Sequence, residues 1–385
     1  MDIPGFRRPG GSFGIRNHVL ILPTVGCAAE TARAAAAAAP GTVAVANQQG
    51  CGQIGRDAEM TIRTLIGLAS NPNVFAAVVL GLGCETARAE NVANAVAEGG
   101  TPVELVVIQD EGGTVRAAEK AAAAARRLLE GAAQQERRPC PLAGLTVALE
   151  CGGSDPTSGL AANPAVGAAG DRLVAEGGTL ILSETTELIG AEHLLAARAQ
   201  DPEVARGILK LVQDLEASVR GMGGSLRGGN PSPGNIAGGI TTLEEKSLGC
   251  VLKGGSTPPV EVLAYAQAPT RHGLVVMDSP GADVESLTGM AAAGAQLCLF
   301  TTGLGTPVGN PVMPVLKITA NPRTFERMGD NLDLFVGQPL AGVGSIEEAG
   351  LRIFEEMLRV AAGSQTRAER FGFAEFAVWR AGVSV

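Results

Sequence analysis

The 385-residue sequence has few aromatic side chains and no excess of positive charge. Aromatic residues make up 3% of the chain, with one Trp and one Tyr, and the formal net charge at pH 7 is −9. Proteins that bind nucleic acid use basic surfaces to hold phosphates and aromatic rings to stack on bases. The composition therefore argues against a nucleic-acid partner.

The chain also lacks a long uninterrupted apolar run. Gly, Pro or a charged residue breaks every stretch that approaches the roughly 18 residues of a membrane span. The N-terminal stretch MDIPGFRRPGGSFG has a basic pair but no apolar stretch that ends at a small-residue cleavage site, so we expect no secretory signal and no membrane association. We expect a cytoplasmic protein, in which the seven cysteines are reduced thiols.

Apolar strand patterns alternate with helical patterns over the first 130 residues. Such alternation predicts a parallel, doubly wound sheet with helices on both faces. The expected strands are 19–23, 42–46, 75–82 and 103–109, and the expected helices are 28–39, 57–69, 86–97 and 115–129.

Residues 130–144 are polar and contain Pro, so we interpret them as a linker. The sequence thus predicts the α/β class with two domains, 1–138 and 142–385, each built on a mostly parallel sheet flanked by helices. In the second domain we expect strands at 145–149, 179–182, 273–277, 296–300 and 315–319, and helices at 161–176, 192–222 with a break, and 345–361. Residues 223–239 form a long Gly/Pro/Asn loop of the kind that is usually functional or disordered.

Three cysteines, Cys27, Cys51 and Cys84, share one local pattern. Each follows a Gly and lies at or just beyond the carboxyl end of an expected strand. In an open parallel sheet these ends line one edge, where ligands bind, so the three thiols can converge. Three thiolates with an open coordination position suit an iron-containing hydro-lyase, whether the metal is one ferrous ion or an iron–sulfur cluster. The alternative is that each Cys is a small apolar residue at a strand end.

The other cysteines do not follow this pattern. Cys140, Cys250 and Cys298 are expected to be inert. Cys151 opens the segment CGGSD after the first strand of the second domain, and there Ser154 and Asp155 can form either a cradle for a carboxylate or an N-cap for the next helix.

A dense polar cluster follows the strand at 179–182. Glu184, Glu187 and His193 lie within ten residues of each other and offer metal ligands or acid–base groups. Lys246, Lys253 and Lys317 lie near Gly-rich loops or strands, where a lysine can bind a substrate carboxylate or act as a base; a solvated surface lysine is the alternative.

The stretch TTGLGTPVG at 301–309 resembles a dinucleotide fingerprint only superficially. NPVMP follows it instead of a helix, so the strand–turn–helix context is missing and we reject nicotinamide binding.

Many long segments resemble the altronate/galactarate dehydratase family. They include GIRNHVLILPTVGC, NPNVFAAVVLGLGCE, CGGSDPTSGLAANPAVGAA, GGTLILSETTELIGAEHLLAARA, NPSPGNIAGGITTLEEKSLG and TTGLGTPVGNPVMPVLKITANP, in the family's order and over nearly the whole chain. The resemblance implies a cytoplasmic hydro-lyase that dehydrates a sugar acid with ferrous iron, an iron–sulfur cluster or manganese. Family members often carry a small N-terminal SAF-type domain, so it also implies a separate small subunit, and we expect a homo-oligomer.

Three positions depart from the family pattern. Asn47-Gln48-Gln49 stands where a His commonly precedes the GCG motif, Leu304 replaces an Arg, and Gln338 replaces an Asp. Loss of an imidazole and a guanidinium alters metal and anion binding, so the substrate need not be altronate or galactarate.

The expected reaction removes the proton beside the carboxylate and then a hydroxide, which yields a 2-keto-3-deoxy acid. One alternative is a related lyase that cleaves sulfolactate or another small hydroxy acid, and another is a non-catalytic binding paralogue; the resemblance favours dehydration. We assign Cys27, Cys51 and Cys84 to the metal, His193 or Lys246 as the base, and Glu184 or Glu187 as its partner. The expected substrate-binding residues are Ser154, Asp155, Asn230, Asn235, Thr302 and Thr306.

Overall fold

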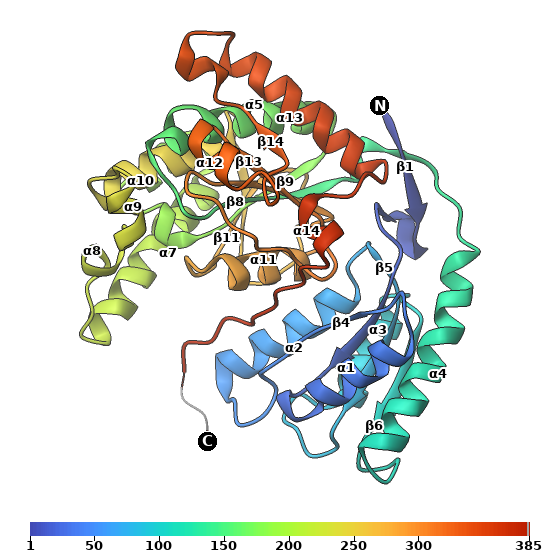
Figure 1. The fold of residues 1–385 in the computed structure, drawn as a ribbon. Helices are drawn as coiled ribbons and strands as arrows, with labels where there is room; N and C mark the ends of the chain where they lie inside the picture. The colour runs from blue at the N-terminus through green and yellow to red at the C-terminus, as the bar shows by residue number, and fades with distance from the viewer. Residues whose placement is uncertain (383–384) are drawn as a thin grey trace.

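The computed structural model describes residues 1–382 and 385 and contains two parallel sheets, each within its own α/β layer (Figure 1). The smaller sheet has the strand order β4-β3-β5-β6, and all its pairs are parallel. Its strands are β3 (His18–Pro23), β4 (Val43–Ala44), β5 (Val74–Gly81) and β6 (Val103–Val107). The α/β prediction is therefore confirmed.

Side chains of β3 and β5 point alternately to the two faces of this sheet, and each face is covered by its own pair of helices. Ile21 and Val78 face an apolar cluster with helices α1 (Ala29–Ala38) and α4 (Thr114–Ala133). Leu20 and Val79 face the opposite cluster with α2 (Gly55–Ala69) and α3 (Ala89–Glu98). Helices thus cover both faces, which is why these strands read as continuous apolar runs.

The larger sheet has seven parallel strands in the order β10-β11-β9-β8-β12-β13-β14. They are β8 (Thr146–Cys151), β9 (Thr179–Leu182), β10 (Pro259–Leu263), β11 (Gly273–Met277), β12 (Leu297–Thr301), β13 (Val315–Thr319) and β14 (Leu334–Phe335). Helices α5 (Asn163–Ala175) and α13 (Ile346–Ala361) cover one face, and α11 (Asp283–Ala292) covers the other. The chain extends the sheet in one direction from β8 to β9 and in the other from β8 to β12, so the ends of β8 and β12 flank a switch in strand order, where open α/β sheets bind ligands.

Several elements differ from the sequence-based expectation. The expected linker at 130–144 contains β7 (Arg138–Pro141), which pairs with β1 (Asp2–Arg7) in a small antiparallel sheet completed by β2 (Phe13–Gly14). The strand β7 inside this segment was not predicted, because a Pro-containing edge strand has no apolar periodicity. The expected helix at 192–222 is broken into α6 (Glu192–Ala197) and α7 (Pro202–Gly221), as predicted. The expected loop at 223–239 contains the short helices α8 (Leu226–Gly229) and α9 (Pro233–Ala237), and α10 (Leu243–Cys250) follows. The remaining helices are α12 (Pro322–Arg327) and α14 (Arg367–Phe371).

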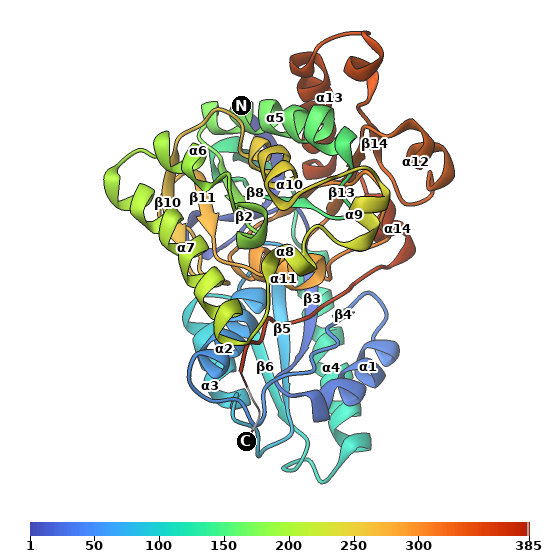
Figure 2. The ribbon, with the colours of Figure 1, turned by 90° about the vertical axis from the view of Figure 1, so that its left-hand side faces the viewer.

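Helices α2 and α11 lie between the two sheets and pack against each other (Figures 1 and 2). Gly67 on α2 approaches the backbone of α11 so closely that a Cβ there would lie 2.2 Å from the carbonyl oxygen of Ala292. One apolar cluster, which includes Leu65, Leu68, Met290 and Phe300, continues from one layer to the other.

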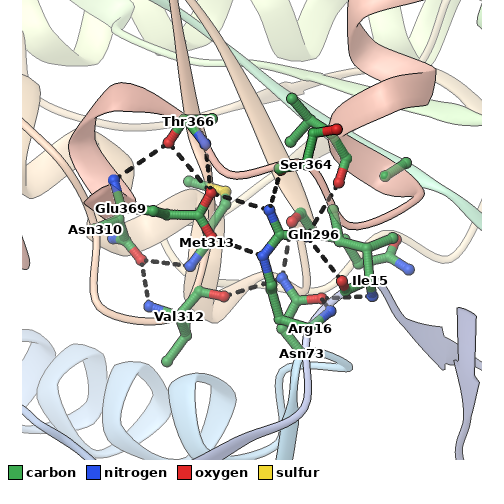
Figure 3. Close-up of polar contacts among 12 residues, drawn as sticks. Ile15, Arg16, Asn73, Gln296, Asn310, Val312, Met313, Ser364, Thr366 and Glu369 are labelled. Carbon is green, nitrogen blue, oxygen red and sulfur yellow. Dashed lines mark hydrogen bonds and ion pairs between the residues drawn. The ribbon is translucent and has the colours of Figure 1, made fainter. Parts of the chain in front are cut away.

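A buried polar network joins the layers near β1 (Figure 3). The Asn73 amide donates to the carbonyl oxygens of Gln296 at 2.8 Å and Val312 at 2.9 Å, and its Oδ1 accepts from the Ile15 nitrogen at 2.8 Å. Arg16 and Glu369 form an ion pair at 2.6 Å beside it. Within the described residues, we find no helix with the length and apolar character of a membrane span.

Candidate active site

The three cysteines of the Gly-Cys pattern follow three adjacent strands of the smaller sheet. Cys27 follows β3, Cys51 follows β4 and Cys84 follows β5, and all three are exposed. Backbone hydrogen bonds join their loops: the Gly26 nitrogen donates to Gln49 at 3.2 Å, and Ala87 donates to Gly50 at 2.9 Å. The sheet therefore brings these loops to one edge.

The loop before Cys51 needs a glycine for two reasons. Gly50 has a φ of +111°, and a Cβ there would lie 2.0 Å from the Thr24 carbonyl oxygen. The turned backbone lets the Cys51 loop lie directly against the end of β3. The side chain of Gln53 accepts from the Gly50 nitrogen at 3.0 Å, while its buried Nε2 has no hydrogen-bond partner.

The donor chemistry at this edge fits iron, since thiolates are its preferred ligands in clusters. Sulfur atoms on one ion lie about 2.3 Å from it, so all three would be within about 4.6 Å of one another. Among the described residues, two groups of three candidate ligands lie within 4.8 Å of one another, and neither contains Cys27, Cys51 or Cys84. The structure therefore does not place these three thiols at the mutual spacing that ligands of one ion require.

The second domain has a cavity of about 430 Å³ at the carboxyl end of β8. Cys151 and Gly152 line it from β8, and Glu184 lines it from the end of β9. The other lining residues come from α7, α8, α9, α10, α11 and their loops: Gly153, Thr186, Val219, Ser225, Leu226, Gly229, Asn230, Ser232, Asn235, Lys246, Gly281 and Asp283. This cavity is where the topology predicts a ligand.

The buried Lys253, the partly buried Lys246 and two buried glutamates form an ion-pair network in the cavity wall. Lys253 Nζ lies 2.7 Å from Glu187 and 3.6 Å from Glu184, while Lys246 Nζ lies 3.3 Å from Glu187. Lys246 also donates to Asn230 Oδ1 at 3.2 Å. Both glutamates and Lys253 are at most 3% exposed, so this network is shielded from water.

The surroundings shift the pKa values of these neighbouring carboxyl groups in opposite directions. Burial raises the pKa of Glu184 well above its usual range, and the neighbouring Glu150 and Glu187 carboxylates raise it further. Burial also raises the pKa of Glu150 to about 8. For Glu187 the burial effect is outweighed by the Lys253 and Lys246 ammonium groups, so its pKa falls to about 2. These shifts favour the protonated form of Glu184 and the anionic form of Glu187, which pairs with both lysines.

The buried sulfurs of Cys151 and Cys250 lie beside Glu187. These three side chains offer ligand atoms within 4.8 Å of one another. Cys151 Sγ contacts Ser154 Oγ at 2.9 Å, and the Asn163 amide donates to it at 3.8 Å. A hydrogen bond from Cys250, against the opposing effect of burial, lowers the pKa of Cys151 to about 6.

The structure brings some of the predicted site residues to the cavity and not others. Glu184, Asn230, Asn235 and Lys246 line it. Glu187 supports Lys246 from behind, and Ser154 contacts Cys151. His193 is exposed on α6 and is not among the residues that line this cavity.

Other predicted polar residues have structural partners. Asp155 accepts from the Ser158 nitrogen at 3.1 Å and from the Asn321 amide at 2.8 Å, as a turn residue does. Thr302 and Thr306 accept from nearby backbone nitrogens. Lys317 donates to the carbonyl oxygens of residues 307 and 308 at 2.9 and 3.0 Å.

Sequence reasoning missed Cys250 and Asp283. Cys250 ends α10 without a preceding strand, so no local pattern shows that it lies against Cys151. Asp283 starts α11, and only the folded sheet shows that it lies within 4.8 Å of Glu150 and Glu184. No local sequence motif could reveal either contact, because the residues that meet are about 100 positions apart in the chain.

An ion pair connects the two candidate centres. Arg56, five positions after Cys51, lies 3.0 Å from Asp278 at the end of β11. Asp278 accepts from Thr185 Oγ1 at 2.8 Å, directly after Glu184. The Cys51 loop and the Glu184 loop thus share a chain of polar contacts across the domain boundary.

Comparisons with known proteins cover both domains. The model of the D-galactarate dehydratase/altronate hydrolase second domain matches residues 5–133, and that of the D-galactarate/altronate dehydratase C-terminal domain matches residues 142–384. The chain is 40% identical to a (2R)-sulfolactate sulfo-lyase subunit beta of Chromohalobacter salexigens over 98% of this chain and 96% of that protein. It is 37% and 34% identical to altronate dehydratases of Bacillus subtilis and Escherichia coli, over 99% and 100% of this chain and 78% and 79% of those proteins. The chain therefore belongs to the D-galactarate/altronate dehydratase family, which is a family of lyases.

Proposed function

We propose that the chain is the catalytic subunit of a lyase that dehydrates a sugar acid bearing one carboxylate to a 2-keto-3-deoxy acid. The observation that carries this proposal is the lining of the cavity at the end of β8. Among its described lining residues, Lys246 is the one cationic side chain, and it stands among amides, hydroxyls and two carboxyl groups. One ammonium pairs with one carboxylate, and the remaining polar groups suit the hydroxyls of an aldonate.

The same lining disfavours a second permanent anion. The sulfonate of sulfolactate, or the second carboxylate of an aldarate, would lie among Glu184, Asp283 and neutral groups, with no further cation among the described residues that line this cavity. An unpaired anion in a confined site has a large desolvation cost. The proposal therefore ranks aldonates above aldarates and sulfolactate.

The residues of the cavity can perform both proton transfers. Lys246, held by Glu187 and Asn230, binds the substrate carboxylate. Asp283 removes the proton from C2, since burial raises its pKa and makes it a stronger base than an exposed carboxylate. Glu184 donates its proton to the hydroxyl that leaves C3, so water departs and the enol tautomerises to the 2-keto acid.

The family implies iron, and Cys27, Cys51 and Cys84 are the residues that would hold it as a cluster or ion. When bound, it would supply Lewis-acid stabilisation of the carboxylate and hydroxyl oxygens. Arg56 on α2, a helix that begins four residues after Cys51, pairs with Asp278, which also contacts Thr185 next to Glu184, and this supports a role for both centres in one active site.

Cleavage of sulfolactate with release of sulfite is the second candidate. It is favoured by the 40% identity to a sulfo-lyase subunit of matched length and by Leu304, which stands where the family pattern has an Arg. The two candidates are separated by incubating the enzyme with both substrate classes and measuring the mass of the product.

We also infer a small partner subunit encoded apart. The altronate dehydratase relatives extend beyond the matched region, whereas the relative of matched length is named as a subunit beta. A second cavity of about 300 Å³ adjoins Lys246 and Cys250, and its rim bears Leu160, Leu248 and Leu252, which are 67%, 48% and 43% exposed. An apolar rim beside a polar site is typical of a docking surface, and a small subunit seated there would close the site.

A further inference from the structure

We propose that Cys151, Cys250 and Glu187 bind one divalent ion, zinc or ferrous iron, in the wall between the two cavities, as a metal site separate from the three Gly-Cys thiols. The three side chains come from the end of β8, the loop after β9 and the end of α10, and all are buried. Their ligand atoms lie within 4.8 Å of one another, which is the spacing that ligands of a single ion require.

Unsatisfied groups in the cluster point to a missing partner. Glu187 is 1% exposed, and its Oε1 has no hydrogen bond in correct geometry, although Lys246 Nζ lies 3.3 Å away. The other oxygen, Oε2, is held by Lys253 at 2.7 Å. Lys253 therefore orients one carboxylate oxygen, and the other, which has an ion pair with Lys246 but no hydrogen bond, keeps a lone pair that can bind a metal ion.

The charge of the cluster accommodates a divalent ion. The ammonium groups of Lys253 and Lys246 would repel a cation if the two thiols stayed protonated. As thiolates, Cys151 and Cys250 together with the Glu187 carboxylate would supply three negative charges, which offset the two ammonium groups and one charge of the ion.

The ligand set also defines the class of ion and leaves a position open. Two thiolates and one carboxylate favour zinc or ferrous iron over calcium or magnesium, which prefer oxygen ligands. Three protein ligands are fewer than the four of a closed structural zinc site. Because Cys151 borders one cavity and Cys250 borders the other, an ion has a route to the site, and its free position can take water or a hydroxyl group.

The test counts metal ions and does not depend on turnover. The C27S/C51S/C84S variant is purified anaerobically and titrated with Co²⁺ and then with Zn²⁺. Bound metal is measured by inductively coupled plasma mass spectrometry. The proposal predicts one bound equivalent and a sulfur-to-cobalt charge-transfer absorption in the near ultraviolet. Cys250→Ser in this background should remove both signals, and Glu187→Gln should weaken binding at least tenfold.

Cys298→Ser is the matched control, because Cys298 is equally buried on β12 but belongs to neither ligand group. It should retain the full equivalent and the absorption band. If the triple variant does not fold, wild type and C250S are compared directly, and the proposal requires a difference of one equivalent. Equal metal content in these two proteins overturns it, as does a Cys151–Cys250 disulfide in anaerobic wild-type protein. Because substrate turnover is not measured, failure of this site leaves the proposed dehydration to be judged separately.

Discussion

Lys246 on α10 donates a hydrogen bond at 3.2 Å to Asn230, in the segment between α8 and α9. This contact places the one cationic group of the cavity beside a chain segment that also supplies Ser232 and Asn235 to the lining. Replacement of Lys246 by Met removes the charge and keeps most of the side-chain volume. We expect kcat/KM for an aldonate to fall at least 100-fold, mainly through KM, because an uncompensated carboxylate would be left in the cavity. Steady-state kinetics measure this.

The control for this variant is Lys210→Met, since Lys210 is exposed on α7 and pairs with Asp214. That variant should keep the kinetics of the wild type. A K246M enzyme with unchanged KM would show that the substrate carboxylate binds elsewhere.

Glu184 is held at the cavity in an unusual backbone conformation, with φ +64° and ψ +73°. A non-glycine residue in this region is strained, and such strain is concentrated at functional sites. Glu184→Gln keeps the shape and removes the transferable proton, so kcat should drop by about 10²–10⁴ while the melting temperature stays close to that of the wild type. Glu216→Gln on α7 is the control. Retention of more than a tenth of the wild-type kcat would exclude Glu184 as the acid.

Asn73 satisfies four backbone groups from separate segments and is fully buried. Asn73→Ala leaves these groups without partners, so the free energy of unfolding should fall by about 2–4 kcal/mol in a urea titration. Asn94→Ala on the exposed face of α3 serves as the control and should change it by less than about 0.5 kcal/mol. Equal effects of the two substitutions would mean that the network contributes nothing to stability.

The pH dependence of stability should report on His18. Burial lowers the pKa of His18 to about 4, despite the nearby Glu369 carboxylate, whereas an unfolded His titrates near 6.5. The unfolded chain therefore binds this proton first, and stability is lost as the pH falls from about 6.5 to about 4, by at most about 3 kcal/mol. His18→Gln should flatten this part of the profile, measured by denaturant unfolding at several pH values. His272→Gln, at an exposed position, should leave the slope as it is in the wild type.

The apolar rim predicts how the partner subunit associates. Leu160→Glu combined with Leu248→Glu should weaken co-purification of the small subunit at least tenfold, because charges would enter a desolvated contact. Leu351→Glu on α13 introduces the same charge at an exposed leucine elsewhere and should not affect association. Undiminished association of the double variant would place the partner on another face.

Much of the fold could be predicted because its strands are buried on both faces. The segments at 75–82 and 273–277 are apolar throughout, which only a covered parallel strand or a buried helix explains. By contrast, β7 and β10 are short and contain Pro, so their sequences show no periodic pattern. The conformation of β7 depends on its pairing with β1, and that of β10 on its pairing with β11.

Asn230, Asn235 and Lys246, which line the cavity, could be predicted from the polar Gly-rich segments around them, and other site residues from their places at strand ends. Glu184 and Cys151 follow β9 and β8, and the parallel-sheet rule places them at one edge. Asp283, Cys250 and Lys253 reach the same region from helices, and their contacts depend on packing that one sequence does not reveal. His193 shows the limit of local reasoning, since it is near Glu187 and Glu192 in sequence but lies on the exposed side of α6 and does not line the cavity.

The most direct test of the account uses the chain together with the small subunit proposed above, purified anaerobically and supplied with ferrous iron. It is incubated separately with aldonates, aldarates and sulfolactate, and the products are identified by mass. The account predicts that an aldonate loses one water to give a 2-keto-3-deoxy acid, and that K246M lowers kcat/KM for this reaction at least 100-fold. Release of sulfite from sulfolactate without turnover of any aldonate would contradict it.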